Sequence, residues 1–243
     1  MLYRWNELVG HRLDEAGHYR LRALEQVCPD RARFATCLAD GSRGQVEVFR
    51  VGEEEAGGRL RMWGELQALG HPHLETIVDY GRVRWEGDHY VYVVTPRPNA
   101  CLGDVLDEVT LGAEEKREIA GAVLSALAAL HERGWTHRGV GPETVVAVGD
   151  RTVLRLESIG RSGMGDAAAD MRALGRLLAA LCGEDESLGQ LAARCLGGMG
   201  ATEGLRLLEA REGGQAEGVQ RRLLWAATVV SLTVAVVAVW NGV

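Results

Sequence analysis

Apolar and polar residues alternate along three stretches near the start of the chain, at residues 19–24, 33–38 and 45–51. A repeat of two is typical of strands with one buried face, because successive side chains point to opposite sides of a sheet. Two more short strands are expected at residues 76–80 and 90–94, with a Glu-Gly-Asp turn between them. The first hundred residues are therefore predicted to be rich in strands.

In other stretches the apolar residues recur every three to four positions, as in a helix with one buried face. Residues 59–69 predict a short helix, residues 113–131 a long one, and Asp170 opens a further helix with a core-facing apolar stripe. Two glutamates occupy the first turn of the long helix, where the helix dipole favours them. Residues 145–148 and 152–156 predict a hairpin across a Gly-Asp turn.

The end of the chain is apolar, and no charged residue occurs over the 21 positions of residues 223–243. At about 1.5 Å per residue this length spans roughly 30 Å, the hydrocarbon thickness of a bilayer. Trp225 and Trp240 lie near the two ends, where indole rings favour the membrane interface. The pattern predicts a transmembrane helix at residues 223–241. The alternative is a buried core helix.

Arg221 and Arg222 flank the N-terminal side of this segment, and no basic residue follows it. By the positive-inside rule, the bulk of the chain is expected in the cytoplasm, held at the cell membrane by a single-pass tail anchor. Residues 212–222 are expected to form a flexible linker. Residues 1–18 lack the apolar core of a signal peptide and are interpreted as a leader.

Composition narrows the kinds of partner. The chain has 243 residues and a net charge of −7, and no basic stripe interleaves with aromatic residues, which argues against nucleic acid as a partner. The five cysteines are scattered and never form a Cys-x-x-Cys spacing, which argues against a disulfide framework or a zinc site. Such usage favours a reducing compartment.

The centre of the chain carries a recognisable motif. The predicted long helix ends at Gly134, a turn with His137 and Arg138 follows, and two short strands then close on the Ser-Ile-Gly sequence of residues 158–160. This order resembles the catalytic core of the protein kinase family, whose pattern is His-Arg-Asp-x-Lys-x-x-Asn followed by Asp-Phe-Gly. The resemblance covers roughly residues 19–211.

The resemblance implies a two-lobed α+β fold followed by one C-terminal transmembrane helix. The N-lobe, an antiparallel sheet, is expected at residues 19–96, and the shortened, mainly helical C-lobe at residues 97–211. Only nine residues separate Gly160 from Asp170. The C-lobe is therefore expected to lack a full activation segment.

The groups that perform the family's chemistry are absent at the matching positions. Gly139 stands at the catalytic Asp, Gly141 at the Lys, Thr144 at the Asn and Ser158 at the metal-binding Asp. Glycine has no side chain to accept a proton, and neutral hydroxyls are poor ligands for Mg²⁺, which proteins hold mainly through carboxylates. The nearest carboxylate, Glu157, is one residue out of register and is expected on the opposite face of its strand. No metal site is predicted.

The N-terminal half departs from the family's nucleotide-binding pattern as well. The expected connection between the first two strands, residues 25–32, contains Pro29 and no glycine, where the family has a glycine-rich loop. Arg50 matches the family's phosphate-pairing Lys, on the same strand face as Val48, and an ordinary solvated arginine is the alternative. Met62 matches the Glu that pairs with this Lys in the family.

Thr95 and Arg97 lie in a Thr-Pro-Arg-Pro stretch that corresponds to the family's hinge. The Thr95 carbonyl and the Arg97 N–H are weak candidates to bind an adenine-like group, and a rigid linker is the alternative. No cofactor is expected, with weak binding of ATP and Mg²⁺ left open. His137, Arg138 and Asp170 match residues that brace the family's catalytic loop, and we interpret all three as structural.

These observations predict a membrane-anchored, catalytically inactive protein-kinase-like domain, that is, a pseudokinase. It is expected to be a signalling scaffold or regulator that binds a protein partner in the cytoplasm, for which an active kinase is one candidate. The alternative is a weak or atypical ATP-dependent serine/threonine protein kinase that uses Arg50 and Glu157.

Overall fold

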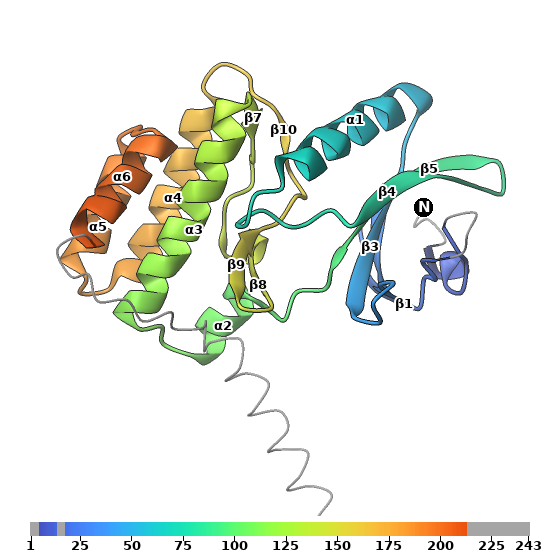
Figure 1. Cartoon of the computed structure of the whole chain (residues 1–243), viewed down its shortest axis with the longest axis horizontal. Helices are drawn as coiled ribbons and strands as arrows, with labels where there is room; N and C mark the ends of the chain where they lie inside the picture. The colour runs from blue at the N-terminus through green and yellow to red at the C-terminus, as the bar shows by residue number, and fades with distance from the viewer. Residues whose placement is uncertain (1–4, 14–17, 213–243) are drawn as a thin grey trace, which may run out of the picture. The chain divides into compact units, whose positions relative to one another are not determined.

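The computed structural model describes residues 5–13 and 18–212, with only the backbone for the last two of them (Figure 1). Within these ranges the chain divides into two compact units. The first holds the residues up to Gly70 together with Glu75–Arg97, and the second holds His71–Leu74 together with the residues from Pro98 onward. Each unit is described by itself.

The first unit is built on a five-stranded sheet of order β1-β2-β3-β5-β4, in which each strand is antiparallel to its neighbours. Every second residue of β2 is buried, as expected for a sheet with unlike faces. The strands are β1 (Ala23–Val27), β2 (Arg31–Cys37), β3 (Arg43–Arg50), β4 (Asp79–Trp85) and β5 (Asp88–Pro96).

The turn between β1 and β2 is tighter than the sequence pattern predicts. The expected connection of residues 25–32 shrinks to three residues, Cys28, Pro29 and Asp30, because both strands continue into it. A hydrogen bond of 2.8 Å from Cys28 N to Arg31 O closes the turn. Backbone pairing between β1 and β2 outweighs the low strand propensity of these polar residues.

Helix α1 (Glu53–Leu69) covers one face of the sheet (Figure 1). It begins six residues before the predicted start, since three glutamates in its first turn favour a helix N-terminus. Its buried Trp63 lies 5.7 Å from the ring of Phe49 on β3 and 6.2 Å from that of Tyr80 on β4. The contact between helix and sheet is therefore aromatic.

The opposite face of the sheet is covered by the start of the chain. Residues 5–13, here called the N-terminal strap, begin with a 3-10 helix at Trp5–Leu8 and place Trp5, Leu8 and Leu13 in the core. Trp5 is 1% exposed and meets the Tyr90 ring edge-on at 6.2 Å. Residues 5–13, which were interpreted as part of a leader, are thus packed within the first unit.

The second unit is mainly helical. Helices α3, α4, α5 and α6 pack against one another, and β6, β8 and β9 form a small sheet, while β7 pairs with β10 (Figure 1). The helices are α2 (Leu102–Glu108), α3 (Ala113–Glu132), α4 (Asp166–Cys182), α5 (Glu186–Leu196) and α6 (Ala201–Glu212). The strands are β6 (Ala100–Cys101), β7 (Trp135–Thr136), β8 (Val145–Val148), β9 (Arg151–Leu154) and β10 (Gly160–Arg161).

Helix α4 begins at Asp166, four residues before the predicted start, so the segment between β10 and α4 is even shorter than the sequence suggests. A glycine allows α4 to approach α5 closely. A Cβ at Gly175 would lie 2.9 Å from Leu196 N and 3.0 Å from Ala192 O, both backbone atoms. Only glycine fits this contact without moving one of the helices.

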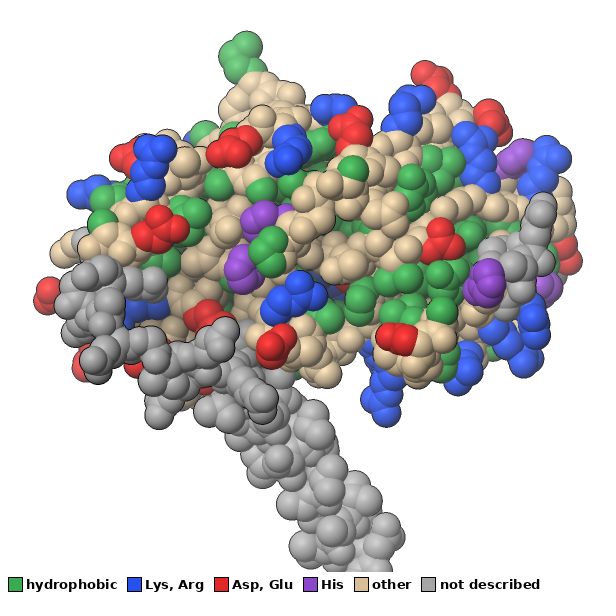
Figure 2. All heavy atoms as spheres, viewed as in Figure 1, with side chains coloured by type: hydrophobic (Ala, Val, Ile, Leu, Met, Phe, Trp, Pro, Cys, Tyr) green, Lys and Arg blue, Asp and Glu red, His purple; other side chains and the backbone are tan. Residues whose placement is uncertain are grey.

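Among the described residues, no helix combines the length and the apolar character needed to cross a membrane. The predicted transmembrane helix at residues 223–241 and all but the first residue of the predicted linker lie outside the described residues. On the face shown in Figure 2, basic and acidic side chains are interspersed.

The strap generates a first prediction. Replacing Trp5 by Ala should lower the free energy of unfolding by about 3–5 kcal/mol, because it leaves a large cavity between the strap and the sheet. Urea denaturation followed by circular dichroism measures this loss.

Replacing Val9 by Ala is the matched control, since Val9 lies in the same strap and is exposed. It should change the free energy of unfolding by no more than about 0.5 kcal/mol. Equal small effects of both substitutions would show that the strap does not contribute to the core.

Candidate functional site

The loop that follows β7 holds the residues of the kinase-like motif. His137 is fully buried, and its Nε2 lies 2.7 Å from Arg155 O. Because a carbonyl oxygen only accepts, Nε2 carries the proton, and Nδ1 is left to accept a hydrogen bond of 3.3 Å from Gly139 N. Burial lowers the pKa of His137, so the ring stays neutral in this arrangement.

The carboxylate of Asp170 on α4 holds the backbone of this loop by hydrogen bonds. Its Oδ2 accepts a hydrogen bond of 2.7 Å from His137 N and its Oδ1 accepts one of 2.7 Å from Arg138 N. Oδ2 also lies 3.0 Å from Nε2 of His131 at the end of α3. Burial by itself would raise the pKa of Asp170, but these hydrogen bonds together outweigh it and hold the pKa below its usual value.

Arg138 holds the short segment between β10 and α4. Its backbone is left-handed, with a φ of 62°. The guanidinium donates to Arg161 O and, at 3.1 Å, to Oδ2 of Asp166, which also accepts from Gly163 N at 2.9 Å. It packs so closely on Gly160 that a Cβ there would lie 2.6 Å from its Nη1. The carboxylate of Asp166 thus links Arg138 to the segment between β10 and α4.

Gly139 lies against Ser158, which decides what this position can carry. A Cβ on Gly139 would lie 2.8 Å from the hydroxyl oxygen of Ser158 and 3.2 Å from its Cβ. Real Cβ contacts are rarely this short. The positions that match the family's two aspartates are therefore packed together, and a side chain at position 139 would require Ser158 to move.

Thr144 and Gly141 form a tight turn instead of a ligand site. The Thr144 hydroxyl lies 2.8 Å from Gly139 O and 3.0 Å from Gly141 O, and it accepts a hydrogen bond of 3.1 Å from Gly141 N. The Thr144 hydroxyl therefore forms its hydrogen bonds with the backbone of the loop. Thr144 therefore shapes the loop and is poorly suited to hold a metal ion.

Glu157 lies near the loop but is already paired. Its carboxylate is 3.2 Å from Nη1 of Arg155, and both side chains are largely buried. The structure thus gives Glu157 a structural ion pair within the second unit.

In the first unit Arg50 points away from α1. Strand alternation places it on the face of Val48, and its guanidinium lies 3.5 Å from the carboxylate of Asp88 in a pair that is about half exposed. Phe49 occupies the face toward α1, where it meets Trp63 and lies 4.3 Å from the guanidinium of Arg59. Met62 precedes Trp63 in the sequence and is partly buried.

Thr95 and Arg97 are engaged within the sheet. The Thr95 side chain is buried, with its hydroxyl 3.2 Å from a carboxylate oxygen of Glu75 and 3.0 Å from the amide nitrogen of Gln45. Arg97 N donates to Arg43 O at 3.0 Å, and the Arg97 guanidinium lies 2.8 Å from Glu25. The Arg97 N–H that the sequence offered to an adenine-like group is therefore already used.

Sequence reasoning missed Asp166 and Phe49 as the residues that make these contacts. Asp166 follows a glycine at a helix start, a position where acidic residues are favoured, and this signal could have found it. The position of Phe49 follows from the same strand alternation that was used for Arg50. The contact between Gly139 and Ser158 has no signal in the sequence, because it depends on the fold.

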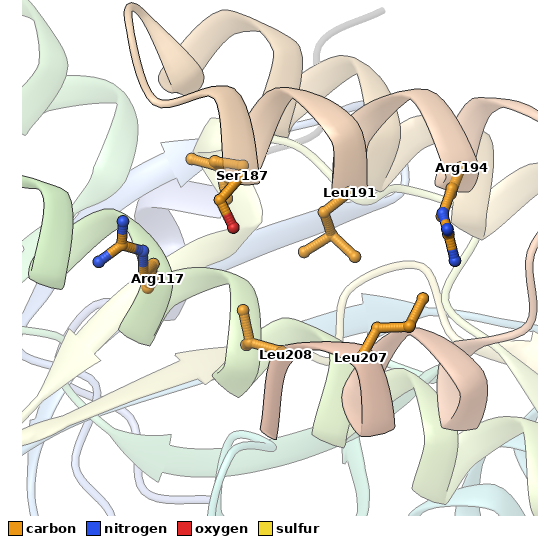
Figure 3. A pocket seen from close by; sticks show the side chains of 7 residues that line it. Arg117, Ser187, Leu191, Arg194, Leu207 and Leu208 are labelled. Carbon is orange, nitrogen blue, oxygen red and sulfur yellow. The ribbon is translucent and has the colours of Figure 1, made fainter. Parts of the chain in front are cut away.

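A cavity lies between α5 and α6, with Arg117 of α3 at one end and Arg194 at the other (Figure 3). Leu191 and Leu207 face each other across it. Its volume is about 10 Å³, close to the minimum for a single water molecule. This cavity is too small to hold an organic ligand.

Comparison with known proteins agrees with the motif. No family profile matches the chain. The phosphorylase b kinase gamma catalytic chain, liver/testis isoform, of Mus musculus is 26% identical over 152 residues, 60% of this chain and 36% of that protein. The serine/threonine-protein kinase csk1 of Schizosaccharomyces pombe is 35% identical over 81 residues, 33% of this chain and 25% of that protein. The chain spans about a third or less of the length of these curated relatives.

Two solved structures share the fold. The kinase domain of PknI from Mycobacterium tuberculosis gives a TM-score of 0.61 at 17% identity, over 84% of this chain and 97% of that one. The pseudokinase domain of BIR2, an immune regulator of the RLK/Pelle family, gives 0.63 at 16% identity, over 80% and 82%. The chain is protein kinase-like. Its sheet-based and helical units confirm the predicted α+β fold of that kind.

The kinase-like loop generates a second prediction. Replacing Gly139 by Ala should lower the free energy of unfolding by about 1–3 kcal/mol, because the new methyl group overlaps Ser158. Replacing Gly141 by Ala is the control, since a Cβ there meets nothing within 4 Å. It should stay within about 0.5 kcal/mol of the parent. Urea denaturation measures both.

A double-mutant cycle with Ser158→Gly tests the cause. Removing the serine side chain should restore most of the loss caused by Gly139→Ala, with a coupling of at least about 0.5 kcal/mol. Strictly additive effects would mean that the two positions do not press on each other.

Proposed function

We propose that this chain is a non-catalytic, protein-kinase-like domain that acts by binding a protein partner at the cytoplasmic face of the cell membrane. The observation that carries the proposal is the packing of Gly139 against Ser158. Glycine has no side chain to accept a proton at the position where kinase chemistry needs one, and Ser158 lies where the first atom of such a side chain would be.

The residues at the matching positions do not fit ATP and Mg²⁺. Mg²⁺ is held in proteins through carboxylates and substrate phosphates. The hydroxyl of Thr144 is hydrogen-bonded to backbone carbonyls, and the side chain of Ser158 has no charge. In the first unit, Arg50 is paired with Asp88 and the turn between β1 and β2 contains proline and no glycine.

The proposed binding role and membrane anchor have separate support. A bracing network without catalytic groups supports a role in binding, and one of the structures with this fold is a pseudokinase domain. The uncharged residues 223–241, preceded by Arg221 and Arg222, support a tail anchor with the kinase-like part in the cytoplasm. An active kinase is one candidate for the partner.

The catalytic part of the proposal gives a third prediction. The purified full chain, incubated with Mg²⁺ and γ-labelled ATP with and without a general protein substrate, should transfer no more label than a sample without enzyme. A variant with both Arg50→Ala and Glu157→Ala should give the same background. A thermal-shift titration with Mg-ATP should also show no stabilisation.

The two results separate this proposal from its rival. Magnesium-dependent labelling, or a thermal shift, that the double substitution abolishes would favour a weak phosphotransferase and overturn the non-catalytic assignment. Label that the double substitution leaves unchanged would point to a contaminating kinase, which a second purification step identifies.

The membrane and partner parts give a fourth prediction. The full chain should stay in the membrane pellet after alkaline carbonate extraction, and a chain that lacks residues 223–243 should be released. Crosslinking in native membranes, followed by affinity purification, should recover a protein with the full chain and not with a tagged segment of residues 213–243 alone.

Release of the full chain by carbonate would contradict the anchor. Recovery of the same proteins with the isolated tail, or of none above background, would contradict partner binding through the kinase-like part. The two outcomes are independent, so each part of the proposal can fail without the other.

A further inference from the structure

The turn at His71–Leu74 lies in sequence between α1 and β4 of the first unit, yet it packs into the second unit. Helix α1 ends at Gly70, which adopts a left-handed φ of 55°, and the turn then reaches α3 and β9. Leu154 N donates to His73 O at 2.9 Å, and Leu74 forms a parallel bridge with Leu154. The chain therefore enters and leaves the second unit at this turn.

We infer that this turn is a pH-sensitive clasp in which His71 is the sensor and proton uptake by His71 releases the turn from the second unit. The inference concerns how the turn is held within the second unit. It does not depend on whether the chain is catalytic.

The first argument is the hydrogen bonding of His71, which admits one protonation state. His73 N lies 3.2 Å from Nδ1 of His71, so this nitrogen must offer its lone pair. Nε2 then carries the single proton and faces the hydroxyl of Ser125 on α3 at 3.2 Å. A proton on Nδ1 would place two donors against each other and break the link between His71 and His73.

The surroundings of His71 also oppose protonation. The side chain is partly buried, and burial is the main cause that lowers its pKa, followed by the charges of His73 and Arg133. His73 comes from the same turn, with ring centroids 5.9 Å apart, and Arg133 comes from the end of α3. On β9, Thr152 and Leu154 contribute uncharged atoms to the contact.

The hydrogen bond of His73 is made by a donor nitrogen, in contrast to the acceptor nitrogen of His71. Its Nδ1 lies 2.9 Å from Thr152 O, and because the carbonyl only accepts, Nδ1 is the donor. An imidazolium keeps this hydrogen bond and gains a proton on Nε2 only. The two histidines of one turn therefore differ in what acid does to their hydrogen bonds.

The sign of the pH effect follows from the direction of the shift. The folded pKa of His71 lies below its value of 6.5 in the unfolded chain, so the unfolded state binds more protons in acid. The stabilisation from the clasp is complete above about pH 6.5 and is lost as the pH falls below it. Each unit of pKa difference corresponds to a tenfold change in the opening equilibrium of the turn.

The test is hydrogen exchange on the full chain at pH 7.5 and pH 5.5, after correction for the intrinsic rate. The amides of His73 and Leu154 report on the clasp, and they should lose protection at the lower pH in the parent protein. Replacing His71 by Asn keeps an acceptor near Nδ1 and removes the titration. In that variant protection should be the same at both pH values.

Replacing His73 by Asn is the matched control, because the side-chain amide still donates toward Thr152 O while His71 remains. Its loss of protection should match that of the parent. Equal loss in the His71→Asn variant would overturn the inference.

A nuclear magnetic resonance titration of the parent protein decides the case even if a variant fails to fold. A His71 pKa at or above 6.5 would overturn the inference, and a lower pKa would support it.

Discussion

A buried carboxylate, that of Asp170, fixes the centre of the second unit. It is 1% exposed, and a charge removed from water to this degree persists only where donors replace the lost hydration. Two backbone N–H groups of the loop and one imidazole of α3 supply these donors. The path of the loop, and with it the position of Gly139 against Ser158, depends on this network.

The network explains how a kinase-like frame can persist without catalytic groups. Asp170 holds the main chain of His137 and Arg138, and His137 in turn holds the carbonyl of Arg155. None of these hydrogen bonds involves the side chain at position 139. The hydrogen bonds that hold the loop are therefore separate from the side chains that would perform catalysis. A change of side chain at Gly139 or Ser158 removes none of these hydrogen bonds.

Much of the fold could be predicted from local pattern. Alternation located β2 and β3, and helical spacing located α3 almost to the residue, because these elements bury one face along their whole length. The strap was missed because a single turn of 3-10 helix and a few apolar residues give no repeat. The start of α1 was misplaced because its first turn holds three glutamates, and the start of α4 because its first turn holds alanines that add no large apolar residue to the buried stripe.

The candidate site could be predicted only in part. Matching the motif identified the positions of Gly139 and Ser158 and the partners of the loop. It could not show that Arg97 N–H, Arg50 and Glu157 are engaged elsewhere, since those partners, Arg43, Asp88 and Arg155, are set by pairing and turns of the chain. The different hydrogen bonding of His71 and His73 could not be predicted either. It depends on Nδ1 of His71 lying near a donor and Nδ1 of His73 lying near an acceptor.

The N-terminal strap has a consequence for how the protein is made. Trp5 leaves the ribosome long before β5, whose Tyr90 it packs against, so its indole ring has no native partner during much of synthesis. Contacts between such distant parts of a sequence form late, because the intervening chain must first be ordered. The residues of the strap are thus among the last of the first unit to reach their final place, and the nascent sheet keeps an uncovered apolar face until they do.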